Sequence, residues 1–160
     1  MTTSVGDKIP TVDINIMTED GPSSISTDKI FTDKKVAVFG LPGAFTPTCS
    51  ARHLPGFIDN AVAIKAKGIH TIICIAVNDP FVMSAWGKVQ GVGKHIMMAA
   101  EGSAKFANAT GLAVDMSAKG FGVRCKRFSM VVDNGIVKSL NIDAPGTFEV
   151  SSAEVMLGEL

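Results

Sequence analysis

Several classes of protein are excluded by what this chain of 160 residues lacks. Its 15 basic and 15 acidic residues leave no net charge, so nothing suggests nucleic acid or an anionic membrane surface as a partner. No apolar run approaches the roughly 20 residues that a membrane-spanning helix needs. Internal repeats, linkers and low-complexity segments are also absent. We therefore expect residues 1–160 to form a single domain.

Cysteine and histidine are scarce. The three cysteines, Cys49, Cys74 and Cys125, are too few and odd in number for a disulfide scaffold. They favour a reducing compartment and one or two reactive thiols. The cysteines and the three histidines show no metal-ligand spacing, and no glycine-rich phosphate-binding motif occurs. We therefore expect no metal and no other cofactor.

The N-terminal residues contain neither the apolar segment of a secretion signal nor an arginine-rich amphipathic stretch. We expect a mature intracellular protein. Its location would be cytoplasmic, or organellar if a targeting segment has been removed.

Hydrophobic periodicity predicts strands that alternate with helices, and hence an α/β fold with a partly parallel sheet and helices on both faces. Asn134-Gly135 is a strong hairpin signal that adds antiparallel pairing near the end of the chain. Pro55-Gly56 is expected to kink or break the first long helix. Asp79, Ser103 and either Ser151 or Ser152 are expected to cap helices. The expected strands are 11–17, 36–41, 69–77, 94–100, 123–133 and 136–142. The expected helices are 47–67, 80–91, 104–109 and a last one after 152, with one further helical turn within 26–31. Residues 18–27 and 112–121 are expected to be irregular.

The most informative stretch is Pro42-Gly-Ala-Phe-Thr-Pro-Thr-Cys49, between a buried strand and the first long helix. Thr46 is a good N-cap, and Pro47 suits the first helical position because its missing N–H would be unpaired there. Cys49 then falls in the first turn, where backbone N–H groups and the helix dipole favour an anion. Such a position stabilises a thiolate, so Cys49 is a candidate nucleophile.

The pattern Pro-x-x-x-Thr-x-x-Cys, formed by Pro42, Thr46 and Cys49, resembles the active-site motif of the peroxiredoxins. The surrounding residues are similar to the type II, or peroxiredoxin-5-like, subgroup, and the resemblance covers nearly the whole chain. It implies a thioredoxin-like fold with peroxiredoxin elaborations, and an antioxidant oxidoreductase active in cell redox homeostasis. The segments that match, in order, are Phe39–Ser50, His53–Phe57, Val77–Trp86 and Lys126–Asp133.

The resemblance implies a thiol peroxidase that reduces hydrogen peroxide and alkyl hydroperoxides. Cys49 would be the nucleophile and would become a sulfenic acid. Arg127 would reach it across the fold, stabilise the thiolate and polarise the peroxide. Thr46 Oγ would accept a hydrogen bond from the peroxide, the Cys49 N–H would donate one, and Pro42 would shield the thiolate from water. Arg124 is the competing candidate for the arginine.

Other residues near the motif have plainer interpretations. His53 lies four residues after Cys49 and can share its helix face, so it could tune the site, but a packing or dimer-contact role is favoured. Trp86 and Phe45 are interpreted as core or interface residues. The resemblance also implies a homodimer that forms through the face near the active-site loop.

The sulfenic acid must be resolved by a second thiol, and the sequence leaves its source open. Some type II relatives carry a resolving cysteine near the C-terminus, where this chain has Ser151 and Ser152. Cys74 matches a position that plant-type relatives use, yet it lies mid-strand, where a buried thiol would be inert. Cys125 lies two residues before Arg127 and would share its face on a regular strand. The favoured cycle uses one cysteine, with glutathione, glutaredoxin or thioredoxin as reductant.

Two alternatives stay open. One is a two-cysteine peroxidase in which Cys74 resolves the sulfenic acid. The other is a peroxide sensor or holdase, in which Cys49 relays oxidation to a bound partner and turnover is incidental. A dithiol–disulfide oxidoreductase is disfavoured, because Thr46 occupies the first position of the Cys-x-x-Cys motif that such an enzyme needs.

Overall fold

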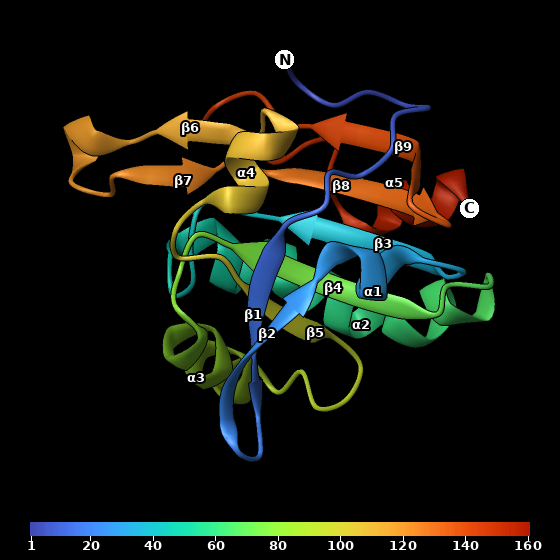
Figure 1. The fold of residues 1–160 in the computed structure, drawn as a ribbon, viewed down its shortest axis with the longest axis horizontal. Helices are drawn as coiled ribbons and strands as arrows, with labels where there is room; N and C mark the ends of the chain where they lie inside the picture. The colour runs from blue at the N-terminus through green and yellow to red at the C-terminus, as the bar shows by residue number, and fades with distance from the viewer.

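A seven-stranded mixed sheet forms the centre of the computed structural model, which describes residues 1–160 (Figure 1). The three central strands run parallel, and the strands on either side of them pair antiparallel. The predicted α/β class with a mixed sheet is therefore confirmed. In spatial order the strands are β2 (Gly21–Ser26), β1 (Asp13–Thr18), β5 (Met97–Ala100), β4 (Thr71–Ala76), β3 (Lys35–Gly40), β8 (Phe128–Asp133) and β9 (Ile136–Ile142).

Helices cover both faces of this sheet (Figure 1). Residues of α1 (Thr27–Phe31) and α4 (Lys105–Thr110) contribute to one hydrophobic core. Residues of α2 (Leu54–Ala66), α3 (Pro80–Gln90) and α5 (Ala153–Glu159) contribute to the other. None of the helices is both long enough and apolar enough to cross a membrane.

Alternate side chains of β3 enter the two cores. Val36 and Val38 pack with the residues of α1 and α4, whereas Ala37 and Phe39 pack with those of α2, α3 and α5. All four side chains are fully buried or nearly so. The sequence of β3 is therefore continuously apolar rather than alternating, as expected for a strand covered on both faces. Its carboxyl end leads directly into the loop that precedes Cys49.

The helix after this loop is irregular at its start. It begins at Pro47, passes through a π-helical turn at Cys49–His53, and continues as α2. The N–H of Leu54 donates to the carbonyl of Cys49, five residues back. The predicted break is therefore present but lies before Pro55 rather than at Pro55-Gly56. Since Pro55 has no N–H and its ring needs space in the preceding turn, a widened turn there accommodates it.

Several local signals act as the sequence predicts. Asp79 accepts a hydrogen bond from the Val82 N–H and caps α3, and Ser152 accepts one from Val155 and caps α5. The turn Asn134-Gly135 joins β8 to β9, and both of its residues have positive φ, 48° and 78°. These two dihedral angles are typical of the tight turns that join antiparallel strands.

The cap of α4 differs from the prediction. Ser103 is not the N-cap; Ala104 is, in the left-handed region at φ 56°. The carboxylate of Glu101 instead accepts hydrogen bonds from the N–H groups of Phe106 and Ala107, at 2.6 and 3.1 Å. A carboxylate at this position satisfies the free N–H groups of the first turn and favourably meets the helix dipole.

Residues 18–27 were expected to be irregular, and this is wrong for most of them. β2 pairs with β1 along its whole length, with Pro22 opposite Met17. Its sequence, Gly-Pro-Ser-Ser-Ile-Ser, has almost no apolar residues to reveal a strand. β2 lies at the edge of the sheet, where proline and polar residues are tolerated because one side of the strand has no partner.

The strand predicted for 123–133 is in fact two strands that belong to different sheets. β7 (Val123–Cys125) pairs with β6 (Ala113–Asp115), in the segment that was expected to be irregular. The chain then leaves this pair at Lys126 and Arg127 before it enters β8. Cys125 and Arg127 therefore do not share a strand face. Cys125 is buried in the core that α1 and α4 cover, on the side of the sheet away from Cys49.

The contact between β3 and β8 leaves no space for a side chain at Gly40. This residue pairs with Phe128, and a Cβ added at Gly40 would overlap the Phe128 ring. We predict that Gly40→Ala lowers the free energy of unfolding by about 1–3 kcal/mol, the usual cost of overpacking a core. Gly158→Ala in α5 is the matched control, because nothing lies near its added Cβ. It should stabilise the protein by about 0.5–1 kcal/mol. Chemical denaturation measures both, and equal stabilities would contradict the prediction.

Candidate active site

Cys49 lies in the widened first turn of the helix that follows β3, and its side chain is 1% exposed. The loop before it is tied to the end of β4, because the side chain of Asn78 accepts a hydrogen bond from the Ala44 N–H at 3.0 Å. The turn at Ala44 and Phe45 places Phe45 in the left-handed region, at φ 63°. Non-glycine residues in this region cost free energy and concentrate at functional sites.

Arg127 lies directly beside Cys49. Its Nη2 is 3.2 Å from Cys49 Sγ, although the two residues are 78 positions apart in the sequence. A guanidinium at this distance favours negative charge on the sulfur. The competing candidate, Arg124, contacts the loop instead: its Nη1 donates to the Pro42 carbonyl at 3.2 Å and its Nε to the Phe121 carbonyl at 2.9 Å. The two arginines thus have different positions, and only Arg127 contacts the thiol.

Thr46 lies one turn before Cys49. Its carbonyl accepts the Ser50 N–H at 3.0 Å, in the first turn of the helix. The expected side-chain cap is replaced by another contact, in which Thr46 Oγ1 donates to the Gly43 carbonyl at 2.7 Å. Because this bond uses the hydroxyl proton, the oxygen can interact with a further group only as an acceptor.

His53 connects Arg127 to a distant loop. Its Nδ1 is 3.0 Å from Arg127 Nη1 and its Nε2 is 3.0 Å from the Ser151 carbonyl. Since a guanidinium only donates, Nδ1 must accept, so the proton is on Nε2 and is donated to Ser151. Burial, and then the charge of Arg127, lower the pKa of His53 to about 3, so the ring stays neutral. The side chain is fully buried and packs against Phe39, so the expected packing is present but a dimer contact is excluded.

The loop between β9 and α5 contributes residues that the sequence did not identify. Phe148 covers the site: its ring centroid lies 5.8 Å from the guanidinium carbon of Arg127 and 5.0 Å from the His53 ring. Asp143 accepts hydrogen bonds from the N–H groups of Glu149 and Val150 at 2.8 and 2.9 Å. No spacing or motif links this loop to Cys49, because it is brought there by contacts between distant segments, the packing of α5 against α2 and the pairing of β9 with β8.

The other two thiols are also buried. Cys74 is fully buried in β4, within the same core as Cys49, and Cys125 is fully buried in the opposite core. Burial raises the pKa of Cys74, and the neighbouring Cys49 raises it further. Burial also raises the pKa of Cys125, and the carboxylate of Glu101 adds to this effect. Both side chains are therefore protonated thiols in the folded protein, and all three cysteines are free.

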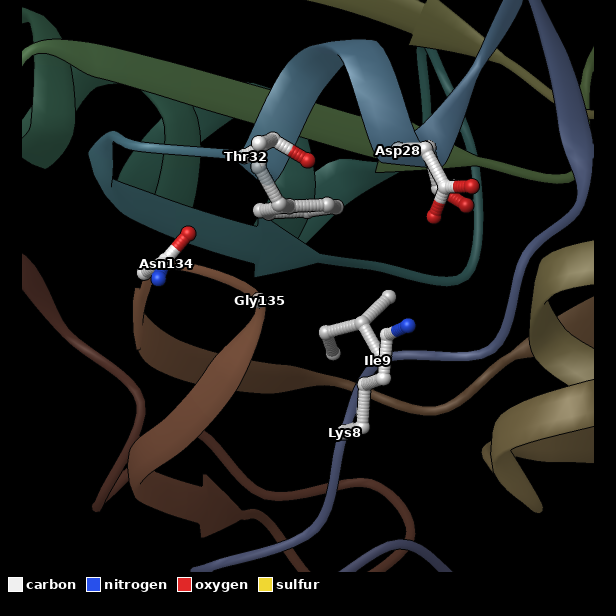
Figure 2. A pocket seen from close by; sticks show the side chains of 8 residues that line it. Lys8, Ile9, Asp28, Thr32, Asn134 and Gly135 are labelled. Carbon is white, nitrogen blue, oxygen red and sulfur yellow. The ribbon is translucent and has the colours of Figure 1, made fainter.

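A separate cavity of about 260 Å³ lies between α1, the N-terminal segment and the β8–β9 turn (Figure 2). Its lining includes Lys8, Asp28 and Asn134, and none of the residues around Cys49 contributes to it. No group of three or more His, Cys, Asp or Glu side chains is placed to hold a metal ion. This cavity is therefore separate from the site around Cys49.

Comparisons with known proteins agree on one family. The family model described as Redoxin matches residues 4–157. Peroxiredoxin-2C of Arabidopsis thaliana is 47% identical over 158 residues, 98% of each chain. The chloroplastic peroxiredoxin-2E of the same plant is 40% identical, over 98% of this chain and 69% of its own. The crystal structure of reduced Prx3 from Vibrio vulnificus in complex with hydrogen peroxide has a TM-score of 0.95 at 43% identity, over 99% of each chain.

Two buried titratable groups give opposite contributions to the pH dependence of stability. Below pH 6.5, its usual pKa, His53 gains a proton in the unfolded chain. In the folded protein the pKa of His53 is about 3, so the ring stays neutral and the free energy of unfolding falls on acidification. Burial raises the pKa of Glu101 from 4.5 to about 7, although the Ala107 and Phe106 N–H groups oppose the shift. The folded protein therefore keeps a proton that the unfolded chain releases, and stability falls as pH rises through this range.

We predict that these two contributions largely cancel between pH 4.5 and 6.5. His53→Gln leaves the Glu101 contribution alone, so stability should increase on acidification by about 1.4 kcal/mol per pH unit relative to the wild type. Glu101→Gln should change the slope by a similar amount in the opposite direction. Urea denaturation at several pH values measures these slopes, and identical slopes in all three proteins would refute the assignment.

Proposed function

Because this chain belongs to the peroxiredoxin family of thiol peroxidases, we propose that Cys49 is the residue that attacks the peroxide. The contact of Arg127 Nη2 with Cys49 Sγ at 3.2 Å supports this assignment most directly. The thiolate would attack one peroxide oxygen, forming an S–O bond while the O–O bond breaks. The leaving oxygen takes a proton and departs as water or an alcohol, and Cys49 becomes a sulfenic acid.

The residues around the sulfur suit the transition state of this step. Arg127 would stabilise the thiolate and the charge that develops on the leaving oxygen. Thr46, whose hydroxyl proton is already donated to Gly43, would accept a hydrogen bond from the peroxide. The Cys49 N–H would donate one, and Pro42 would keep water from the sulfur. Together these contacts would hold the O–O bond in line with the sulfur.

We propose that an external thiol resolves the sulfenic acid. Its thiolate would attack the Cys49 sulfur, form a mixed disulfide and release water, and a second thiol would then free Cys49. The burial of Cys74 and Cys125 supports this cycle, because neither thiol can reach solvent or ionise readily in the folded protein. Glutathione, glutaredoxin or thioredoxin would supply the reductant, in a cytoplasmic setting that suits three free cysteines.

A two-cysteine cycle through Cys74 is the second candidate. One observation favours it: Cys74 and Cys49 belong to the same hydrophobic core, on the same side of the sheet. The full burial of Cys74 in the centre of the sheet, between Phe39 and Met98, opposes it. A disulfide would require the helical turn that holds Cys49 to rearrange around this buried thiol.

We also infer that the chain acts as one domain and as a homodimer. Phe45 and Phe81 are 54% and 66% exposed, and large exposed aromatic side chains are enriched in protein interfaces. Phe45 directly precedes Thr46 in the loop before Cys49. An interface that includes it would adjoin the active site.

The assignment of the arginine is tested by two substitutions. Arg127→Ala should lower the second-order rate constant for peroxide reduction by about 100- to 1,000-fold, because it removes a fixed donor and a positive charge. It should also raise the pH at which the Cys49 thiolate forms. Arg124→Ala, which removes contacts to the Pro42 and Phe121 carbonyls but none to the sulfur, should have a much smaller effect. Stopped-flow kinetics with Cys49→Ser as the inactive reference measures this, and a larger effect for Arg124→Ala would exchange the two roles.

The resolving step is tested by mass spectrometry under non-reducing conditions. After one equivalent of peroxide, we expect a sulfenic acid at Cys49, and a mixed disulfide when glutathione is present. Cys74→Ser should leave steady-state turnover with an external thiol unchanged. A Cys49–Cys74 disulfide, with turnover lost in Cys74→Ser, would establish the two-cysteine cycle instead. A single round of oxidation that no thiol donor reverses would favour a sensor.

A further inference from the structure

Four hydrogen bonds and the chain between them form a closed ring that includes the Arg127 guanidinium. Arg127 Nη1 donates to His53, and His53 Nε2 donates to the Ser151 carbonyl, each at 3.0 Å. The Ser151 hydroxyl donates to the Asp143 carboxylate, and the Asp143 N–H donates to the main-chain carbonyl of Arg127 at 2.9 Å. The ring thus joins the helix of Cys49, the junction before β8 and the loop after β9.

Asp143 is the centre of this arrangement on the loop side. It is 5% exposed, and its carboxylate accepts from Glu149, Val150 and the Ser151 hydroxyl. Burial by itself would raise the pKa of Asp143, but these hydrogen bonds outweigh it and hold the pKa below the usual value. The carboxylate is therefore ionised at neutral pH and holds the end of the loop through three hydrogen bonds.

We infer that Asp143 and Ser151 are positioning residues for peroxide reduction, acting through His53 on Arg127; this inference rests on the function proposed above. The guanidinium has one fixed acceptor on the side away from the sulfur, His53 Nδ1. The Ser151 carbonyl accepts the Nε2 proton, and this bond helps to fix the orientation of the ring and leaves Nδ1 as an acceptor. The Ser151 carbonyl, in turn, is placed by the bonds to Asp143. Loss of the carboxylate should therefore let the arginine move away from the thiolate.

The test uses a series at Asp143 and a neighbouring control. Asp143→Ala should lower the second-order rate constant for hydrogen peroxide about tenfold, the equivalent of weakening one hydrogen bond to a charged group. It should also raise the pH at which the ultraviolet absorbance of the Cys49 thiolate appears. Asp143→Asn should retain most of the rate, because its amide can accept from the loop N–H groups and donate to the Ser151 hydroxyl.

Ser152→Ala is the matched control for stability. It removes the adjacent hydroxyl, which caps α5 and does not belong to the ring, at a cost of about 1 kcal/mol. It should lower the melting temperature without changing the rate or the thiolate titration. If Asp143→Ala does not fold, Ser151→Ala, which deletes one hydroxyl of the ring, should change both readouts in the same direction.

The inference is overturned if the folded ring variant behaves like Ser152→Ala, with lower stability but an unchanged rate and thiolate titration. It is also overturned if Asp143→Asn loses as much activity as Asp143→Ala while remaining as stable as the wild type, because the charge and not the geometry would then matter. Cys49→Ser separates this failure from a failure of the proposed function. If that variant keeps its peroxidase activity, the proposed function itself is wrong.

Discussion

The proposed chemistry depends on one contact, that of the Arg127 guanidinium with Cys49 Sγ. Neither residue is placed by its own strand or helix alone. The loop after β3 and a widened helical turn place the sulfur, and the junction between β7 and β8 places the arginine. The two cores that hold β3 and β8 side by side would therefore be as necessary for the proposed chemistry as the two side chains themselves.

The elements with strong local signals could be predicted from the sequence. The apolar run of β3, the Asp79-Pro80 start of α3 and the Asn134-Gly135 turn each have a cause within a few residues, and each is present in the structure. The motif around Cys49 likewise indicated a reactive thiol at a helix start. The resemblance of Lys126-Arg127-Phe128 to the peroxiredoxins, rather than any periodicity, favoured the arginine that contacts the sulfur over Arg124.

What the sequence could not show depends on contacts between distant segments. β2 is a strand only because β1 lies beside it, since its residues have little preference for one. The division of 123–133 into two strands follows from the pairing of β7 with β6. His53 looked like a packing residue because its partners, Arg127 and Ser151, are far away along the chain. Ser151 stands near the position where some type II relatives carry a cysteine, yet here its carbonyl and hydroxyl serve as structural contacts.

The wide separation of these groups along the chain has a consequence for biosynthesis. A nascent polypeptide that has emerged from the ribosome only as far as β7 contains the cysteine but neither the guanidinium nor the loop that orients it. Its sulfur is then an ordinary thiol, with little tendency to react with oxidants. If the proposed function is right, reactivity would arise only when the final hairpin docks. The geometry that would activate the finished protein would then also protect an incompletely folded chain from oxidation.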